Sequence, residues 1–73
     1  MNTIAEVVNE VWRTSLDGAT GDAEENFFDL GGTSMKAAMM VAELRERGID
    51  VPLRVFFDDG RLVAVVEHAR AST

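Results

Sequence analysis

The chain is short and acidic, with 73 residues, 7 basic and 13 acidic side chains, and a formal net charge of −6. The length fits one domain and the hydrophobic fraction of 47% is typical of a globular protein, whereas the negative charge opposes binding to nucleic acid or anionic membranes. The absence of cysteine excludes disulfides and thiolate metal sites, and no apolar run reaches membrane-spanning length. We therefore expect a cytoplasmic monomer whose partners have basic surfaces.

The first predicted element is a helix from Thr3 to about Leu16. Thr3 and Glu6 form a capping box, in which the threonine caps the helix and the glutamate reaches back to the threonine backbone. Apolar residues recur at helical spacing along this segment and are predicted to face the core. They are Ile4, Val7, Val8, Val11 and Trp12.

A long connection, residues 17–33, separates this helix from the next. Asp17-Gly18 and Gly21-Asp22 are turn signals within it. A loop of this length in so small a domain is usually functional or held in place by its own apolar side chains. Three side chains are predicted to hold it: Phe27, Phe28 and Leu30.

The second predicted helix covers residues 34–47 and stops at Gly48, a helix-ending glycine. Its inward face follows from a spacing of about 100° per residue. This face comprises Ala37, Met40, Val41 and Leu44. Met39 falls among the charged residues of the opposite face, and Met35 lies at the border between the two.

The remaining residues predict an extended link and two further helices. Pro52 disfavours helix at Val51, so residues 49–52 are expected to be extended. A short helix follows at 53–58 and a last helix at 61–71. The inward residues of the last helix are predicted to be Leu62, Val65, Val66 and Ala69.

The order of these elements predicts an all-α fold. It is a small four-helix bundle, with three longer helices, one short helix, and a long loop between helices one and two. Phe56 and Phe57 are adjacent and cannot both face the same core from a short helix. We expect Phe57 to be buried and Phe56 to be partly exposed.

Ser34, at the start of the second helix, is the residue whose chemistry needs an explanation. A serine hydrolase would present its nucleophile in the motif Gly-x-Ser-x-Gly, but the sequence around Ser34 lacks the second glycine. The only candidate base is His68, in the last helix. The stretch 31–34 lacks the lysine of a phosphate-binding loop, and the acids of residues 17–25 lack the ligand spacing of a calcium loop. Taken alone, Ser34 is interpreted as a helix cap, because serine is a favoured capping residue. A cap does not explain the aromatic pair before it or the exposed methionines after it, which weakens this interpretation.

The stretch Phe27-Phe28-Asp29-Leu30-Gly31-Gly32-Thr33-Ser34-Met35 resembles the core motif of peptidyl carrier proteins, the thiolation domains of nonribosomal peptide synthesis. These belong to the acyl carrier protein-like superfamily. The resemblance continues through residues 41–45 and 51–57 and covers nearly the whole chain. It implies that residues 1–73 form a single phosphopantetheine-dependent carrier domain.

The resemblance also implies a covalent cofactor. Ser34 would carry 4′-phosphopantetheine, attached by a magnesium-dependent phosphopantetheinyl transferase, with Gly32 and Thr33 beside the attachment point. The glycines would leave room for the arm and the transferase. The arm would hold an aminoacyl or peptidyl group, or an aryl or acyl group, as a thioester, and the chain itself would catalyse nothing.

The family implies several partner enzymes: an adenylation enzyme that loads the arm, and condensation, tailoring or thioesterase enzymes that act on the carried group. Met39, by its exposure, and Met35, beside the arm, are predicted to contact partners, because methionine suits surfaces that meet several proteins. The other predicted members of this partner surface are Lys36, Arg54 and Phe56. For the charged members, the competing interpretation is solvated surface charge.

Two departures from the family pattern stand out. Thr33 occupies a position that is more often histidine or aspartate. Gly60-Arg61 replaces a common Pro-Thr before the last helix, so the usual cap is missing and we expect fraying there. Other hypotheses stay open: a polyketide-type acyl carrier protein, an unmodified helical interaction domain with Ser34 only as a cap, or a small enzyme that uses Ser34. The initial methionine favours a free-standing protein, although an excised domain would look the same.

Overall fold

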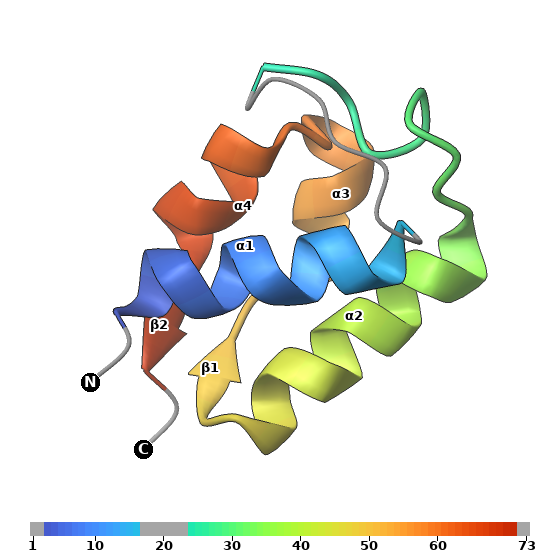
Figure 1. The fold of residues 1–73 in the computed structure, drawn as a ribbon. Helices are drawn as coiled ribbons and strands as arrows, with labels where there is room; N and C mark the ends of the chain where they lie inside the picture. The colour runs from blue at the N-terminus through green and yellow to red at the C-terminus, as the bar shows by residue number, and fades with distance from the viewer. Residues whose placement is uncertain (1–2, 17–23, 72–73) are drawn as a thin grey trace.

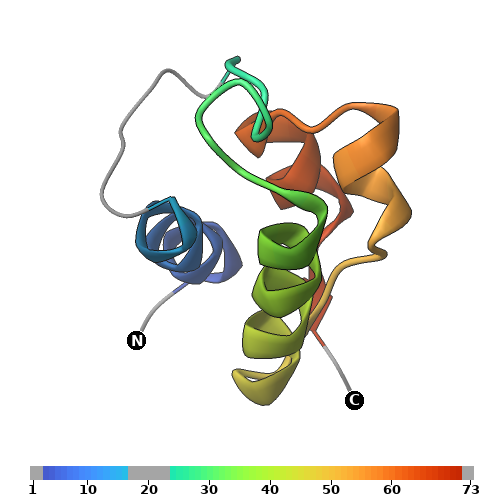
Figure 2. The same ribbon diagram turned by 90° about the vertical axis from the view of Figure 1, so that its right-hand side faces the viewer.

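A computed structural model describes residues 3–16 and 24–71. Its helices are α1 (Ile4–Ser15), α2 (Ser34–Glu46), α3 (Arg54–Asp58) and α4 (Leu62–His68), as Figure 1 shows. Two short strands, β1 (Ile49–Asp50) and β2 (Arg70–Ala71), accompany them. In Figure 2, α1 lies on one side of α2 and α3 on the other. The predicted four-helix all-α fold is confirmed.

Helix α1 begins as its sequence predicts. The Thr3 side chain accepts a hydrogen bond from the Glu6 backbone N–H (3.2 Å), and the Thr3 backbone N–H donates to Glu6 Oε1 (2.8 Å). The capping box is therefore confirmed. It also holds the pKa of the Glu6 carboxyl below its ordinary value, chiefly through the bond from the Thr3 backbone. Trp12, predicted to lie in the core, is buried.

The core gathers residues from every helix and from the loop before α2. Its buried members are Val8, Val11, Trp12, Leu16, Phe27, Ala37, Met40, Leu44, Ile49, Val51, Val55, Phe56, Leu62, Ala64 and Val65. The inward faces predicted for α1, α2 and α4 supply most of this set. Five residues that were also predicted to face inward are only half-buried at its edge: Ile4, Val7, Val41, Val66 and Ala69.

The prediction for the two phenylalanines of α3 is wrong. Phe56 is buried, whereas the Phe57 side chain is 56% exposed. The Phe56 ring lies 5.1 Å from the Phe27 ring and stacks at 6.5 Å on Trp12, so the aromatic core selects it. Phe57 stacks at 5.5 Å on Phe28 at the surface. A helix of five residues is too short for its sequence pattern to choose between them.

The end of the chain also differs from the prediction. Helix α4 ends at His68, three residues before the predicted end at Ala71. Residues 70–71 instead pair antiparallel with β1, with Ile49 opposite Ala71 and Asp50 opposite Arg70. This pairing converts the extended link after α2 into one strand of a two-stranded ribbon.

Candidate functional site

Thr33, and not Ser34, caps helix α2. Its backbone is extended, its hydroxyl accepts a hydrogen bond from the Lys36 N–H (3.1 Å), and its carbonyl accepts from the Ala37 N–H (2.9 Å). Ser34 is the first helical residue and is exposed. The interpretation of Ser34 as a helix cap is therefore wrong.

The start of α2 suits an anion at Ser34. Among the described residues, no hydrogen bond uses the Ser34 hydroxyl. The Thr33 hydroxyl accepts from the Lys36 N–H, and the Ala37 N–H makes the first i→i−4 bond of the helix, to the Thr33 carbonyl. The N–H groups of Ser34 and Met35, in the first turn, have no intrahelical acceptors. These two N–H groups and the positive end of the helix dipole favour a phosphate bonded to Ser34. The residues present thus fit a phosphodiester at this position.

The two glycines before Thr33 have different surroundings. Gly31 adopts φ +97°, which favours glycine, and a side chain there would meet no atom within 4 Å. At Gly32, an added Cβ would lie 2.4 Å from two ring carbons of Phe27. A Cβ would thus meet open space at Gly31, whereas the absence of a Cβ at Gly32 lets the Phe27 ring pack against the backbone.

Aromatic rings hold this loop in place, as predicted. Phe27 is fully buried, and its ring lies edge-on to Trp12 and Phe56 at 5.1 Å in each case. Phe28 is half-buried and contacts both Phe27 and Phe57, and Leu30 packs against the core from its edge. The residues before Ser34 are thus attached to α1 and α3 through their side chains.

A second attachment joins the loop to the turn between α3 and α4. The Asn26 Nδ2 donates to the Asp59 carbonyl (3.0 Å), and its Oδ1 accepts from the Phe28 N–H (2.9 Å). The Phe27 N–H donates to the Gly60 carbonyl (2.7 Å). Asn26 was not among the residues predicted from the sequence, although asparagine commonly forms turns by bonding the backbone two residues on.

Arg61 reinforces this turn from the start of α4. Its guanidinium donates two hydrogen bonds to the Asp59 carboxylate, at 2.6 and 2.9 Å, and one to Glu24 at 2.5 Å. These bonds from Arg61 lower the pKa of the Asp59 carboxyl. Arg61 provides no side-chain cap, as predicted, but its ion pairs fix the residue that precedes α4.

The predicted partner surface is exposed on two helices. Met35 and Met39 are 73% and 64% exposed on α2, Lys36 is half-buried there, and Arg54 on α3 forms an exposed ion pair with Asp58 at 3.3 Å. Phe56 does not belong to this surface because it is buried. Two exposed apolar side chains lie at α3: Leu53, which caps its start, and Phe57 within it.

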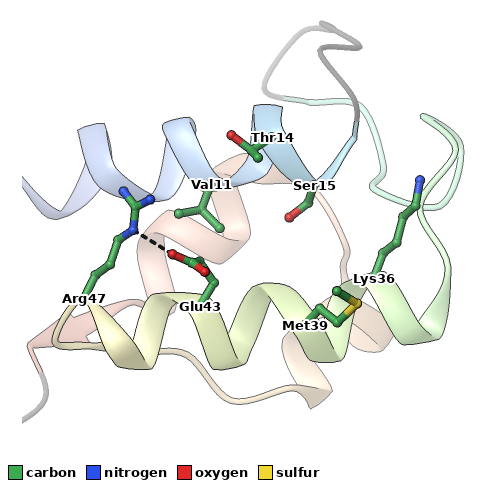
Figure 3. Close-up of a pocket in the computed structure, with 7 residues that line it drawn as sticks. All are labelled: Val11, Thr14, Ser15, Lys36, Met39, Glu43 and Arg47. Atoms are coloured by element: carbon green, nitrogen blue, oxygen red, sulfur yellow. Dashed lines mark hydrogen bonds and ion pairs between the residues drawn. The ribbon is translucent and has the colours of Figure 1, made fainter.

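A groove of about 520 Å³ lies between α1 and α2 (Figure 3). Its lining residues are Val11, Thr14, Ser15, Lys36, Met39, Glu43 and Arg47. At one end Arg47 joins the two helices, through Glu43 at 3.1 Å and Glu10 at 3.4 Å. At about 100° per residue, Ser34 lies on the side of α2 opposite Glu43. The groove is therefore separate from the attachment residue.

Other kinds of site find no support in the described residues. The Nδ1 of His68 is hydrogen-bonded to the Ala64 carbonyl (2.9 Å) within α4. Across residues 3–16 and 24–71, no group of three histidine or acidic side chains could hold a metal ion. In the same residues, no helix is both long and apolar enough to cross a membrane.

Comparison with protein families gives one match that covers almost the entire chain. Residues 2–69 match the model described as "Phosphopantetheine attachment site". One curated relative, surfactin synthase subunit 1 of Bacillus subtilis, is 29% identical over 69 residues, which is 93% of this chain and 2% of the relative. Gramicidin S synthase 2 of Brevibacillus brevis is 33% identical over 58 residues, 78% of this chain and 1% of the relative. The chain thus spans a small fraction of the curated relatives it matches.

A solved structure has the same fold. It is described as the phosphopantetheine transferase Sfp in complex with coenzyme A and a peptidyl carrier protein. One of its chains superposes with a TM-score of 0.76 at 25% sequence identity, covering 92% of this chain and 88% of the other. The similarity therefore extends over the whole arrangement of helices.

Proposed function

Because the chain belongs to the family of phosphopantetheine attachment sites, we propose that it is a peptidyl carrier domain whose arm is bonded to Ser34. One observation of the structure supports Ser34 as the attachment residue. Thr33 supplies the cap of α2, and the exposed hydroxyl of Ser34 makes no hydrogen bond within the part of the chain that the structure describes. The likeness to a carrier found with a transferase and coenzyme A supports the same conclusion.

The chain contributes an acceptor and its surroundings to the attachment reaction. The Ser34 oxygen forms a bond to the pantetheine-bearing phosphorus of coenzyme A, the diphosphate bond breaks, and the adenosine bisphosphate leaves. We assign removal of the hydroxyl proton to the transferase, because no hydrogen bond within residues 3–16 and 24–71 joins the Ser34 hydroxyl to a base. The N–H groups of Ser34 and Met35 would be the donors available to a phosphodiester at this helix start, and a side chain at Gly31 would meet no atom within 4 Å, which leaves space beside it. The attached arm supplies a thiol that holds an aminoacyl or peptidyl group as a thioester.

The chain's role after attachment is to carry and not to catalyse. An adenylation enzyme loads the arm, and condensation, tailoring or thioesterase enzymes use the carried group. We assign the contacts with these partners to Met35, Lys36, Met39 and Arg54, with Phe57 in the place first predicted for Phe56. The net charge of −6 favours partners with basic docking surfaces.

Mass spectrometry of the intact chain tests the attachment. The purified chain is incubated with coenzyme A, magnesium and a broad-specificity phosphopantetheinyl transferase. We expect a gain of one phosphopantetheine, mapped to Ser34, that is lost in Ser34→Ala and kept in Ser15→Ala. A folded chain that gains no mass beside a working control carrier would instead be an unmodified interaction domain. Gain of mass by Ser34→Ala would show that the residue assignment is wrong.

The partner surface is tested separately, after the arm is attached. Met39→Glu places a charge in the exposed part of α2, and we expect it to weaken loading by an adenylation enzyme. Glu46→Gln, on the exposed last turn of the same helix, serves as the control. Unchanged transfer to every partner by Met39→Glu would remove Met39 from the surface.

A further inference from the structure

We propose that Asn26 is a positioning residue for the modification of Ser34. Its side chain connects the loop before α2 to the turn between α3 and α4, and so fixes where the attachment residue lies. This inference rests on the proposed function, because it concerns the same reaction at Ser34. Asn26 itself lies eight residues earlier in the sequence and belongs to neither the attachment point nor the partner surface.

The amide of Asn26 is bonded on both sides. The Nδ2 donates across 33 residues to the Asp59 carbonyl at 3.0 Å, and the Oδ1 accepts from the Phe28 N–H at 2.9 Å. The next backbone N–H, that of Phe27, donates to the Gly60 carbonyl at 2.7 Å. Through its Oδ1 the side chain sets the conformation of the loop, and through its Nδ2 it sets where the loop lies against the turn between α3 and α4.

The place that receives this amide has no spare room. Gly60 is buried with φ +67°, and a Cβ there would lie 2.6 Å from Asn26 Nδ2 and 2.8 Å from the Phe56 carbonyl oxygen. The Asp59 carboxylate beside it is held by Arg61. Asn26 is therefore anchored to a part of the molecule that is itself fixed.

The position of Asn26 is transmitted to Ser34 through Phe27 and Gly32. The Phe27 carbonyl accepts the Gly32 N–H at 3.0 Å, and the Phe27 ring packs against Gly32, whose missing Cβ would overlap it. Gly32 stands two residues before Ser34, with only the capping residue Thr33 between them. A shift of the loop at Asn26 thus moves the start of α2 relative to the transferase.

Two substitutions separate the bonds of Asn26. Asn26→Asp keeps an oxygen for the Phe28 N–H but replaces the donor to Asp59 with a carboxylate oxygen that the Asp59 carbonyl repels. Asn26→Ala removes both bonds. Asn9→Ala is the matched control, because the Asn9 Nδ2 also donates to a backbone carbonyl, that of Ala5 at 2.7 Å, but within α1.

The decisive measurement is steady-state modification by the transferase at varied concentrations of the carrier chain. A substitution that only unfolds part of the sample lowers the concentration of folded substrate, so it raises the apparent KM and leaves kcat unchanged. Misplacement of the acceptor lowers kcat, because displacements of about 1 Å can cost about 100-fold in rate. We expect kcat to fall at least about tenfold for Asn26→Asp and further for Asn26→Ala. Asn9→Ala should match the natural chain.

Amide chemical shifts of the unmodified chain provide a readout independent of the transferase. In Asn26→Asp, the shifts of Gly32 and Ser34 should move, and in Asn9→Ala they should not. Unchanged kcat for both Asn26 variants, or an equal fall for Asn9→Ala, would overturn the inference, as would unmoved shifts in a folded Asn26→Asp. Failure of the natural chain to be modified would instead refute the proposed function.

Discussion

A single added methyl group at Gly32 tests how tightly the loop is packed before the attachment residue. The Cβ of Gly32→Ala would lie 2.4 Å from two Phe27 ring carbons and 2.8 Å from the Phe27 carbonyl oxygen. Non-bonded carbons prefer about 3.5 to 4.0 Å, so the ring must move by more than about 1 Å. Trp12 and Phe56 lie against the ring on other sides and restrict that movement.

We therefore expect Gly32→Ala to cost about 1 to 3 kcal/mol of unfolding free energy, the usual cost of overpacking a core. A 73-residue chain at about 0.05 to 0.15 kcal/mol per residue has a total stability of about 4 to 11 kcal/mol. The loss is thus a large share of the total. Urea unfolding followed by the fluorescence of Trp12, the only tryptophan, would measure it.

A double-mutant cycle identifies the ring as the cause. With the smaller Phe27→Leu present, Gly32→Ala should cost less by at least about 0.5 kcal/mol, because the colliding ring carbons are gone. Gly31→Ala provides the control, since a methyl there meets open space and should show no coupling to residue 27. A Gly32→Ala effect below about 0.5 kcal/mol would refute the close packing.

The structure makes three further predictions. Thr33→Ala should lose about 0.5 to 2 kcal/mol of stability with the α2 cap, whereas Ser34→Ala should stay within about 0.5 kcal/mol, and thermal unfolding of the pair checks this. Phe56→Ala should cost about 3 to 5 kcal/mol and Phe57→Ala much less, in the same assay, because only Phe56 is buried. The Asp59 pKa lies below its ordinary value of 3.8, so its stabilising effect is complete above that value and is lost as the pH falls through the folded-state pKa. Asp59→Asn should therefore flatten the acid end of the pH dependence of urea unfolding.

Local sequence patterns predicted those parts of the fold that depend on local interactions. The first helix has a capping box and a regular apolar repeat, and the buried face of α2 has the same spacing. The burial of Phe56 and Phe57 was predicted wrongly because a helix of five residues is too short to show a repeating apolar pattern. The early end of α4 depends on pairing with Ile49–Asp50, a contact between distant segments that overrides the helix propensity of Arg70 and Ala71.

The candidate site was likewise predictable only in part. The resemblance identified Ser34, but threonine and serine are both good caps, so only the structure shows that Thr33 is the one used. The roles of Asn26 and Gly32 depend on Asp59 and Phe27, whose positions the sequence pattern of the loop does not give.

The two-stranded ribbon has a consequence for how the molecule behaves when it is crowded. Open strand edges can recruit strands from other chains and start aggregation. Here each strand has two residues, and Asp50 and Arg70 lie opposite one another as a pair of unlike charges. Short length and charge are the means by which natural sheets discourage such pairing. The ribbon can therefore secure the end of the chain without offering neighbouring molecules a surface on which a larger sheet could grow.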